Sequence, residues 1–429
     1  MIEVLVAAAI FLACLGLIFS EKINRTIAAF AGAVLMVGAG KIFNFYNETE
    51  AIAAIDFNTL GLLLGMMVLV ALLEPTGFFQ YLAVWAARLS RGQPVRLLIL
   101  LGSVTTVLSM FLDNVTTVVL IAPVTILICE ILGVSALPYL MAEALLSDTG
   151  GVATLVGDPP NVLISSVAGF TFNDFLTHSL PMVLIAWLAA LLLIRFLFRK
   201  ELSVPPSNPD AIQLLDLEQT LHDRKTTRRV LIVLGAALLA LFIHGWLQVS
   251  PAYIALTAAA AALIWLRPEP GSILQRVEWN VLVFFATLFI IVGGLEAAGA
   301  LDGLVSLLGR AGSMSPVLFG VILIWLVAGI SAIVDNIPVT IALIPVIQGL
   351  GASGMDINPL WWALVFGAGF GGNGTIIGST ANIVVTNLSE KTNSPITARL
   401  WNRRGLPVML VTCLIASIFY VIAYPLLLR

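Results

Sequence analysis

Long apolar runs, separated by short stretches of charged residues, glycine or proline, occupy most of the chain. A bilayer core about 30 Å thick is crossed by about 20 helical residues, so these runs have the length of membrane helices or of large parts of them. Fourteen runs are recognised, at residues 2–19, 25–41, 57–73, 95–111, 114–131, 139–165, 179–198, 230–248, 251–266, 279–296, 315–334, 337–350, 360–387 and 405–427. Stretches 78–89 and 301–308 mix apolar with polar positions and are predicted to be interfacial helices.

The composition agrees with a membrane protein and excludes several other classes. Of 429 residues, 60% are hydrophobic and 10% are charged, and the mean hydropathy is +1.05. The longest polar run, 199–229, has the size of a loop and not of a soluble domain. The formal charge of -3 gives no reason to expect a nucleic-acid partner. No motif for a metal, a cofactor or a catalytic residue occurs, so a transporter is predicted and an enzyme is not.

The second half of the sequence repeats the first. Pairs 222 residues apart are followed, after a slip of one residue, by pairs 221 apart. The pairs include Glu74 and Glu296, Asp113 and Asp335, Asn114 and Asn336, Pro123 and Pro345, Gly150 and Gly371, Thr154 and Thr375, Gly157 and Gly378, and Asn161 and Asn382. A register held over a hundred residues indicates a tandem duplication, with a first repeat at 1–200, a cytoplasmic linker at 201–228 and a second repeat at 229–429.

The topology follows from counting crossings. Segments 95–131 and 315–350 each contain two apolar helices joined at a polar tip, and both are predicted to be re-entrant hairpins. Five crossings per repeat remain, and an odd number inverts the second repeat relative to the first. With the N-terminus outside, 18 of the 21 Lys and Arg residues lie on the cytoplasmic side. The prediction is about ten transmembrane helices plus two hairpins, in a bacterial or archaeal cytoplasmic membrane.

Polar residues at membrane depth mark the candidate site. The hairpin tips carry Asp113-Asn114 and Asp335-Asn336, which would either cap a helix or face a bound solute. Broken helices are expected at 139–165 and 360–387, because Gly157 permits a left-handed backbone and Pro159-Pro160 removes two helical donors. Paired broken segments in two inverted halves are the best sequence pointer to a transport site.

Further acidic residues have no acidic counterpart in the other repeat. Glu143 and Asp148 lie in the run that leads into the first break, and Asp148 is either a proton-relay group or a structural one. Asp158 pairs with Ser379 across the repeat and would be either a helix cap or an ion ligand.

The motifs Asp113-Asn114-Val115-Thr116-Thr117 and Gly157-Asp158-Pro159-Pro160-Asn161, with their second-half partners, resemble the ion transporter superfamily. Within it the chain is most similar to the arsenite permease branch, which includes NhaD-type sodium/proton antiporters and the P protein. The resemblance covers nearly the whole chain. It implies two hairpins and two broken helices around a central site, and often a homodimer. An ATPase subunit is a further partner that this branch suggests.

Carried over by motif, the resemblance implies substrate-binding and ion-coupling residues. The substrate-binding set is Asn114, Thr117, Thr154, Gly157, Asn161, Asn336, Thr340, Asn373, Thr375, Gly378 and Asn382. The proton- or ion-coupling set is Asp113, Asp335, Asp148 and Asp158. Dicarboxylate relatives carry serine where this chain has Asp113 and Asp335, so repulsion disfavours a dianionic substrate here.

Two cargoes are consistent with this pattern. The first is arsenite or antimonite, exported in exchange for protons, because neutral As(OH)3 offers hydroxyl groups to Asn, Thr and carboxyl side chains. The second is Na+, exchanged for protons on the same fold, with Asp113, Asp335 and unwound carbonyl groups as ligands. The predicted function is therefore secondary active antiport of a small inorganic solute across the lipid bilayer.

Overall fold

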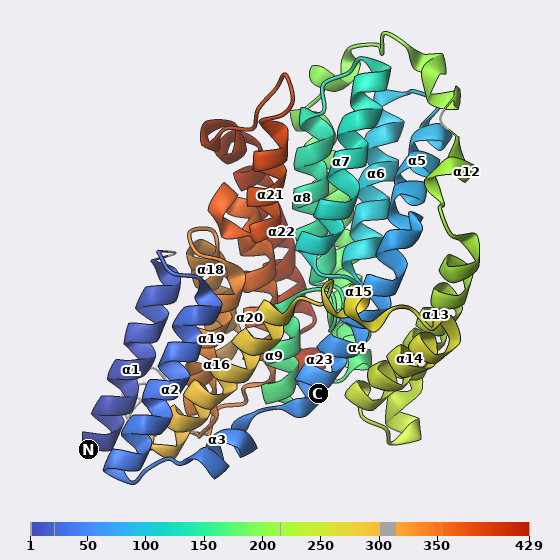
Figure 1. Ribbon diagram of the computed structural model, residues 1–429. Helices are drawn as coiled ribbons and strands as arrows, with labels where there is room; N and C mark the ends of the chain where they lie inside the picture. The colour runs from blue at the N-terminus through green and yellow to red at the C-terminus, as the bar shows by residue number, and fades with distance from the viewer. Residues whose placement is uncertain (1, 21, 215, 301–314, 353, 429) are drawn as a thin grey trace. The chain divides into compact units, whose positions relative to one another are not determined.

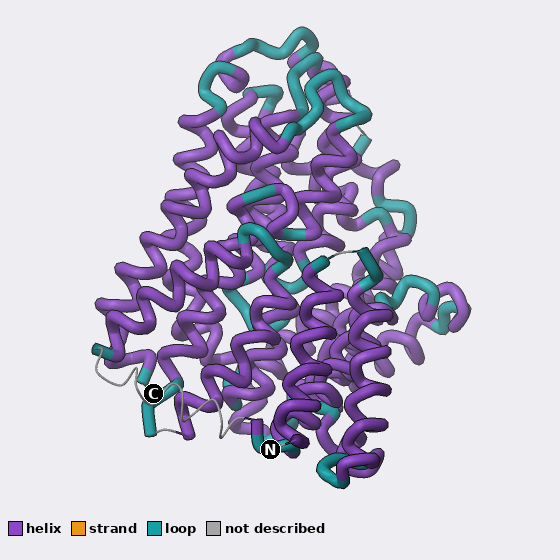
Figure 2. The backbone as a smooth tube through the Cα atoms, turned by 90° about the vertical axis from the view of Figure 1, so that its left-hand side faces the viewer, coloured by secondary structure: helices purple, strands orange, loops and turns teal. Residues whose placement is uncertain are grey.

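The computed structural model describes residues 2–20, 22–214, 216–300, 315–352 and 354–428. Every regular element in these ranges is helical and none is a strand (Figure 2). Seven of the described helices are long and apolar enough to cross a membrane, and several shorter apolar helices accompany them. The predicted all-α polytopic class is confirmed. The predicted interfacial helix at 78–89 is α5 (Phe78–Ser90), whereas the one at 301–308 lies outside the described residues.

The described chain forms two compact units, and each unit draws segments from both predicted repeats. Unit 1 contains Met1–Ala71, Ile232–Ser315 and Thr340–Asn358, and unit 2 contains Leu72–Leu231, Pro316–Val339 and Pro359–Arg429. The compact units therefore divide the chain differently from the predicted repeats at 1–200 and 229–429. The repeats reflect duplication of the sequence, whereas the units reflect packing in space.

Unit 1 is built from closely packed helices near the start and the middle of the chain. Its elements are α1 (Ile2–Phe19), α2 (Arg25–Phe43), α3 (Glu48–Ala54), α4 (Phe57–Leu73), α14 (Pro251–Leu266), α15 (Pro270–Leu274), α16 (Trp279–Ala297) and parts of α13 (Arg224–Leu247) and α19 (Asn336–Ala352). Helix α2 packs against both α1 and α16 (Figure 1). A Cβ atom at Gly32 would lie 2.8 Å from Cys14 Sγ and 3.0 Å from Ile291 Cδ1, so glycine lets the three helices approach closely.

Unit 2 holds the remaining described helices. They are η1 (Glu74–Thr76), α5, α6 (Pro94–Ser109), α7 (Asn114–Leu132), α8 (Leu137–Gly151), α9 (Pro159–Ala168), α10 (Phe172–Asp174), η2 (Phe175–Ser179), α11 (Leu180–Leu197), η3 (Glu201–Ser203), η4 (Pro209–Leu214), α12 (Leu217–Thr220), α18 (Pro316–Ser331), α20 (Asn358–Gly371), η6 (Gly372–Gly374), η7 (Ile376–Gly378), α21 (Thr380–Ser389), α22 (Ala398–Ile422) and α23 (Tyr424–Leu427). Helices α5 to α8 run side by side, and α21 packs against both α7 and α8 (Figure 1). Segments of the second half of the sequence thus lie directly against segments of the first half.

Each segment predicted to be a hairpin consists of two helices with a short polar connection, and both predicted breaks interrupt their helices. The hairpin 95–131 is α6 followed by α7, and the hairpin 315–350 is α18 followed by α19. Proline at the start of α6 and Gly133 (φ 66°) just after the end of α7 set the limits of the first pair. The segment 139–165 is broken between Gly151 and Pro159, and the segment 360–387 is broken between Gly371 and Thr380.

Candidate functional site

The tip of the first hairpin is held by side-chain hydrogen bonds. Asp113 is the N-cap of α7 and accepts from the backbone N–H of Thr116 at 2.9 Å, as the capping interpretation predicts. Asn114 is buried, and its Oδ1 accepts from the hydroxyl of Ser109 at 2.5 Å. Thr117, one turn further along α7, is fully buried, and its hydroxyl has no hydrogen-bond partner among the described residues.

The first broken helix is closed by Asn161. Its Nδ2 donates to the carbonyl oxygens of Gly151 at 3.0 Å and Thr154 at 2.8 Å, which lie at the end of α8 and in the break. The Thr154 hydroxyl donates to the Met110 carbonyl at the hairpin tip and accepts from the N–H of Gly157 at 3.1 Å. A broken helix leaves backbone groups without helical partners, and these side chains satisfy several of them.

The second broken helix is closed in the same way. Asn382 Nδ2 donates to the carbonyl oxygens of Gly372 at 2.8 Å and Thr375 at 3.0 Å. The Thr375 hydroxyl donates to the carbonyl of Ala332, which is the counterpart of Met110. Each of these bonds has its equivalent 221 or 222 residues earlier in the chain. The sequence repeat is therefore matched by a repeat of individual hydrogen bonds.

Glycine is required at Gly157 and Gly378 for close packing and not for a left-handed backbone. Neither residue has a positive φ, so the expectation for Gly157 is wrong in its reason. A Cβ atom at Gly157 would lie 2.6 Å from the Gly151 carbonyl oxygen and 2.7 Å from that of Ser109. At Gly378 the corresponding distance to the Gly372 oxygen is also 2.6 Å. The break folds back onto the preceding backbone so tightly that no side chain fits.

Hydrogen bonds also join the two halves of the sequence inside unit 2. Asn336 Nδ2 donates to Asp158 Oδ2 at 2.9 Å, and the Ser379 hydroxyl donates to Asp148 Oδ1 at 2.9 Å. Asn373 Nδ2 donates to the hydroxyl of Thr149 at 3.3 Å. Each break is thereby tied to the hairpin tip or to the broken helix of the other half.

The structure excludes one of the two roles considered for Asp158, that of a helix cap. Asp158 occupies the N-cap position of α9, but its side chain makes no capping hydrogen bond and is bonded to Asn336. Its counterpart Ser379 does cap α21, by accepting from the N–H of Ala381 at 3.3 Å. Asp335 at the second hairpin tip accepts from the Thr380 hydroxyl at 3.1 Å. The Asp158 carboxyl group is therefore not used as a cap, and it joins the first break to the second hairpin tip.

Several buried oxygen atoms in these segments have no hydrogen-bond partner among the described residues. They are Asp148 Oδ2, Asn373 Oδ1, Asn382 Oδ1 and Thr117 Oγ1, and each side chain is at most 2% exposed. A Cβ atom at Gly372 would lie 3.5 Å from Asp148 Oδ2, which places that oxygen beside the second break. Buried polar atoms are almost always hydrogen-bonded, so each of these four oxygen atoms is a candidate partner for water, an ion or a polar solute.

The electrostatics of the region are acidic. The carboxyl groups of Asp148, Asp335 and Asp113 all lie close enough to Asp158 to interact with it electrostatically. The described residues provide neither Asp148 nor Asp158 with a salt bridge. Over the described ranges no group of three or more His, Cys, Asp and Glu side chains could hold a metal ion.

The predicted site residues are mostly brought together, and a few contributors were not predicted. Thr340 follows Asn336 by one turn of α19 but belongs to unit 1, whereas all the other predicted residues belong to unit 2. Unpredicted contributors are the hydroxyl groups of Ser109, Ser331, Thr149, Ser379 and Thr380. Ser109 and Ser331 are 222 residues apart, and each donates to a carbonyl of the neighbouring broken helix, so the repeat offset could have identified both.

Comparison with known proteins identifies the family. A family model described as "Citrate transporter" matches residues 15–367. The chain belongs to this citrate transporter family. As a member of that family the protein is a membrane transporter of small solutes and not an enzyme, in agreement with the prediction from its sequence.

Known relatives are similar to this transporter over nearly its whole length. It is 37% identical to the "46 kDa membrane protein" of Mycobacterium leprae over 425 residues, which cover 98% of each chain. It is 31% identical over 503 residues to the human P protein, covering 98% of this chain and 60% of the P protein. The predicted resemblance to the P protein is thereby confirmed. The crystal structure of the Alcanivorax borkumensis YdaH transporter matches with a TM-score of 0.62 at 15% identity, covering 99% and 98% of the two chains, which shows a shared fold.

Proposed function

We propose that this transporter is a proton-coupled antiporter that exports arsenite or antimonite. The observation that carries the proposal is the Asp148 carboxyl group, which is 2% exposed, accepts one hydrogen bond from Ser379 and has a second oxygen without a described partner. An ionised carboxylate without a counter-charge is costly at membrane depth, and such groups commonly serve in proton relays. Asp148 is thus suited to exchange a proton for the transported solute.

The charge of the site limits the cargo. Asp158 lies near Asp148, Asp335 and Asp113, and Asp148 lies near Asp335. No described basic side chain forms a salt bridge with Asp148 or Asp158. Free citrate carries several negative charges at neutral pH and would be repelled by these carboxylates. A neutral hydroxylated solute avoids this repulsion, and As(OH)3 can donate to oxygen acceptors such as Asn373 Oδ1 and Asn382 Oδ1.

Sodium is the second candidate cargo, supported by the same acidic environment. A hard monovalent cation prefers oxygen ligands, and the breaks at 151–159 and 371–380 supply backbone carbonyl groups beside the carboxylates. Against it, Asn161 and Asn382 already bind four of these carbonyl oxygens. The proposal therefore ranks the neutral metalloid first.

The proposal includes a location and partners. The transporter would lie in a bacterial or archaeal cytoplasmic membrane with its N-terminus outside, act as a homodimer, and bind an ATPase subunit where the cell supplies one. These statements rest on the distribution of Lys and Arg residues and on the family resemblance.

The test uses everted vesicles whose lumen is acidified and followed with a pH-sensitive dye. Arsenite alone is expected to collapse the pH gradient in vesicles with the natural protein and to leave it intact in vesicles with Asp148→Asn. An Asp216→Asn variant, which changes an exposed linker carboxylate, serves as the control for loss of an acidic residue. Collapse with Na+ alone would move the protein to the second candidate. Collapse with citrate alone would refute the argument from charge.

A further inference from the structure

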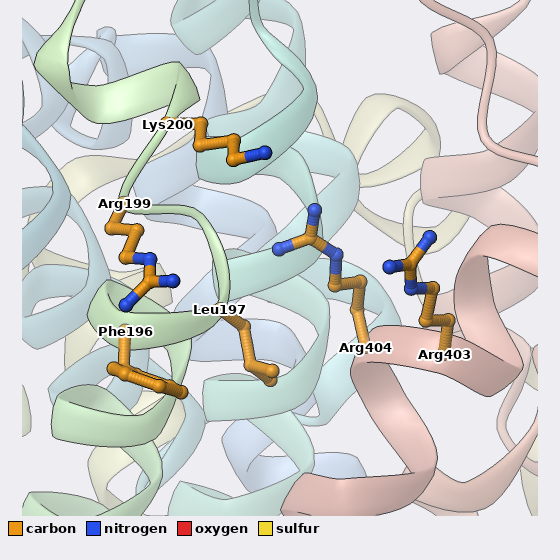
Figure 3. A pocket seen from close by; sticks show the side chains of 6 residues that line it. All are labelled: Phe196, Leu197, Arg199, Lys200, Arg403 and Arg404. Atoms are coloured by element: carbon orange, nitrogen blue, oxygen red, sulfur yellow. The ribbon is translucent and has the colours of Figure 1, made fainter.

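A basic cavity lies at the ends of two packed helices of unit 2, and none of its lining residues belongs to the predicted transport site. It is lined by Phe196, Leu197, Arg199, Lys200, Arg403 and Arg404 and has a volume of about 250 Å³. The first four residues come from the end of α11 and the turn after it, and the two arginines come from the first turns of α22. Figure 3 shows the Lys200 ammonium group and the Arg404 guanidinium group directed toward the same space.

The charges of the cavity are only partly balanced. Arg404 donates to Glu201 Oε1 at 3.1 Å, and its guanidinium group lies 4.6 Å from the centroid of the Phe198 ring. The Nε of Arg404 is buried without a described hydrogen-bond partner. No described salt bridge involves Arg199, Lys200 or Arg403. Four cationic side chains against one carboxylate make a site for an anion with several acceptor oxygens, such as a phosphate group.

Apolar stripes lead away from the cavity along both helices. On α11 the exposed residues Leu184, Ile185, Leu188, Leu192 and Phe196 follow helical spacing and end at the cavity. On α22 the exposed residues Leu406, Leu410, Leu414, Ile418 and Val421 share the helix face of Arg403. The two helices pack against each other. Basic residues at the end of exposed apolar helix faces match the two parts of a phospholipid, a charged head group and its acyl chains.

We propose that this cavity binds the phosphate head group of an anionic phospholipid, whose acyl chains lie along the apolar stripes of α11 and α22. The cavity lies on the side of the membrane that the distribution of Lys and Arg predicts to be cytoplasmic. Helix α22 packs against α18 and against η6, which contains Asn373 of the second break. A lipid bound at the start of α22 would therefore restrain a helix that contacts the second break.

The experiment measures lipid retention by native mass spectrometry of the whole transporter, titrated with dioleoylphosphatidylglycerol or dioleoylphosphatidylcholine. The natural protein is expected to retain the anionic lipid in preference to the zwitterionic one. Removing one surface cation weakens anionic lipid binding about fivefold, so the Arg199→Gln/Arg403→Gln variant is expected to bind phosphatidylglycerol about thirtyfold more weakly. Arg96→Gln removes an exposed arginine at the start of α6, outside the cavity, and is expected to bind as the natural protein does.

A soluble competitor separates the head group from the complete lipid. Glycerol 3-phosphate carries the phosphate group without acyl chains and is expected to compete only at concentrations far above those of the lipid. Competition at equal concentration would overturn the lipid assignment and leave a site for a soluble phosphate compound. Arg199 and Arg403 are both exposed, so replacing them should leave the fold and the melting temperature unchanged. If the double variant melts like the natural protein and still retains phosphatidylglycerol equally well, the proposal is overturned.

Discussion

Replacing Asn161 by alanine tests whether the first break is held together by this one side chain. The substitution removes two hydrogen bonds, from Asn161 Nδ2 to the carbonyl oxygens of Gly151 and Thr154. Asn161 is 1% exposed, so little water reaches the two carbonyl groups from outside the protein. Leaving a buried acceptor unsatisfied costs about 1–3 kcal/mol, so two acceptors give a loss of about 2–6 kcal/mol in the stability of this segment.

The loss is measured as the apparent melting temperature of purified protein in detergent, together with hydrogen exchange of peptides that span 145–165. A drop of several degrees and faster exchange confined to this region are expected. Asn208→Ala is the matched control, because Asn208 is exposed and its side chain makes no described hydrogen bond. Asn382→Ala should give a loss of similar size in the second break, because its two bonds are equivalent.

The argument would be refuted if Asn161→Ala melted within a degree of the Asn208→Ala control and exchanged at the same rate. That result would mean that the carbonyl groups of the break find other partners at no cost. A loss in Asn161→Ala without a comparable loss in Asn382→Ala would show instead that the repeated hydrogen bonds carry unequal energies.

Three further predictions follow from local geometry. Gly157→Ala places a Cβ atom 2.6 Å from a carbonyl oxygen and is expected to lower stability by about 1–3 kcal/mol, whereas Gly329→Ala, which meets no atom within 4 Å, should leave the melting temperature unchanged or raised. Thr125→Val removes the donor that lies 2.5 Å from buried Glu143 Oε1 and is expected to cost about 1–3 kcal/mol in the same assay, while Thr125→Ser should retain most of the stability. Hydrogen bonds from the Thr226 hydroxyl and from backbone N–H groups in the first turn of α13 lower the pKa of Asp223, so its capping is present at neutral pH and lost as the pH falls through the lowered pKa. The protection of the amides in that turn, relative to their intrinsic exchange rates at each pH, should therefore fall in acid in the natural protein and lose this dependence in Asp223→Asn.

The repeat offset identified residue pairs that make matching hydrogen bonds in the two breaks, because a duplication preserves the residues that hold the backbone. Asn161 and Asn382 occupy equivalent positions and make equivalent pairs of bonds, as do Thr154 and Thr375 with the hairpin tips. Glycine and proline predicted the first break, and the repeat offset extended that prediction to the second break, which contains no proline. The structural reason for Gly157 did not, because close approach of two backbone segments depends on packing between parts of the chain that a local pattern does not describe.

The bonds between the two halves could not be predicted from the sequence. The offset pairs Asp158 with Ser379, yet in the structure Asp158 is bonded to Asn336 and Ser379 is bonded to Asp148. These contacts depend on how the broken helices and hairpin tips pack within unit 2. The division into two compact units could not be predicted from the sequence for the same reason, since each unit is assembled from segments far apart in the sequence.

These contacts suggest different roles for residues that occur in both repeats and for residues that occur in only one. The residues that occur in both repeats, Asn161 with Asn382 and Thr154 with Thr375, have their donors engaged by backbone carbonyl groups, so their first task is to keep two broken helices in shape. The carboxyl group of Asp148 has no acidic counterpart, because Gly369 occupies the equivalent position. A symmetric frame can alternate between two equivalent openings, but a carrier that couples transport to protons in one direction needs a titrating group, and one carboxyl group at one position is enough. Under the proton-coupled exchange proposed above, we therefore expect coupling to depend on the asymmetric carboxylates and the integrity of the two breaks to depend on the symmetric amides.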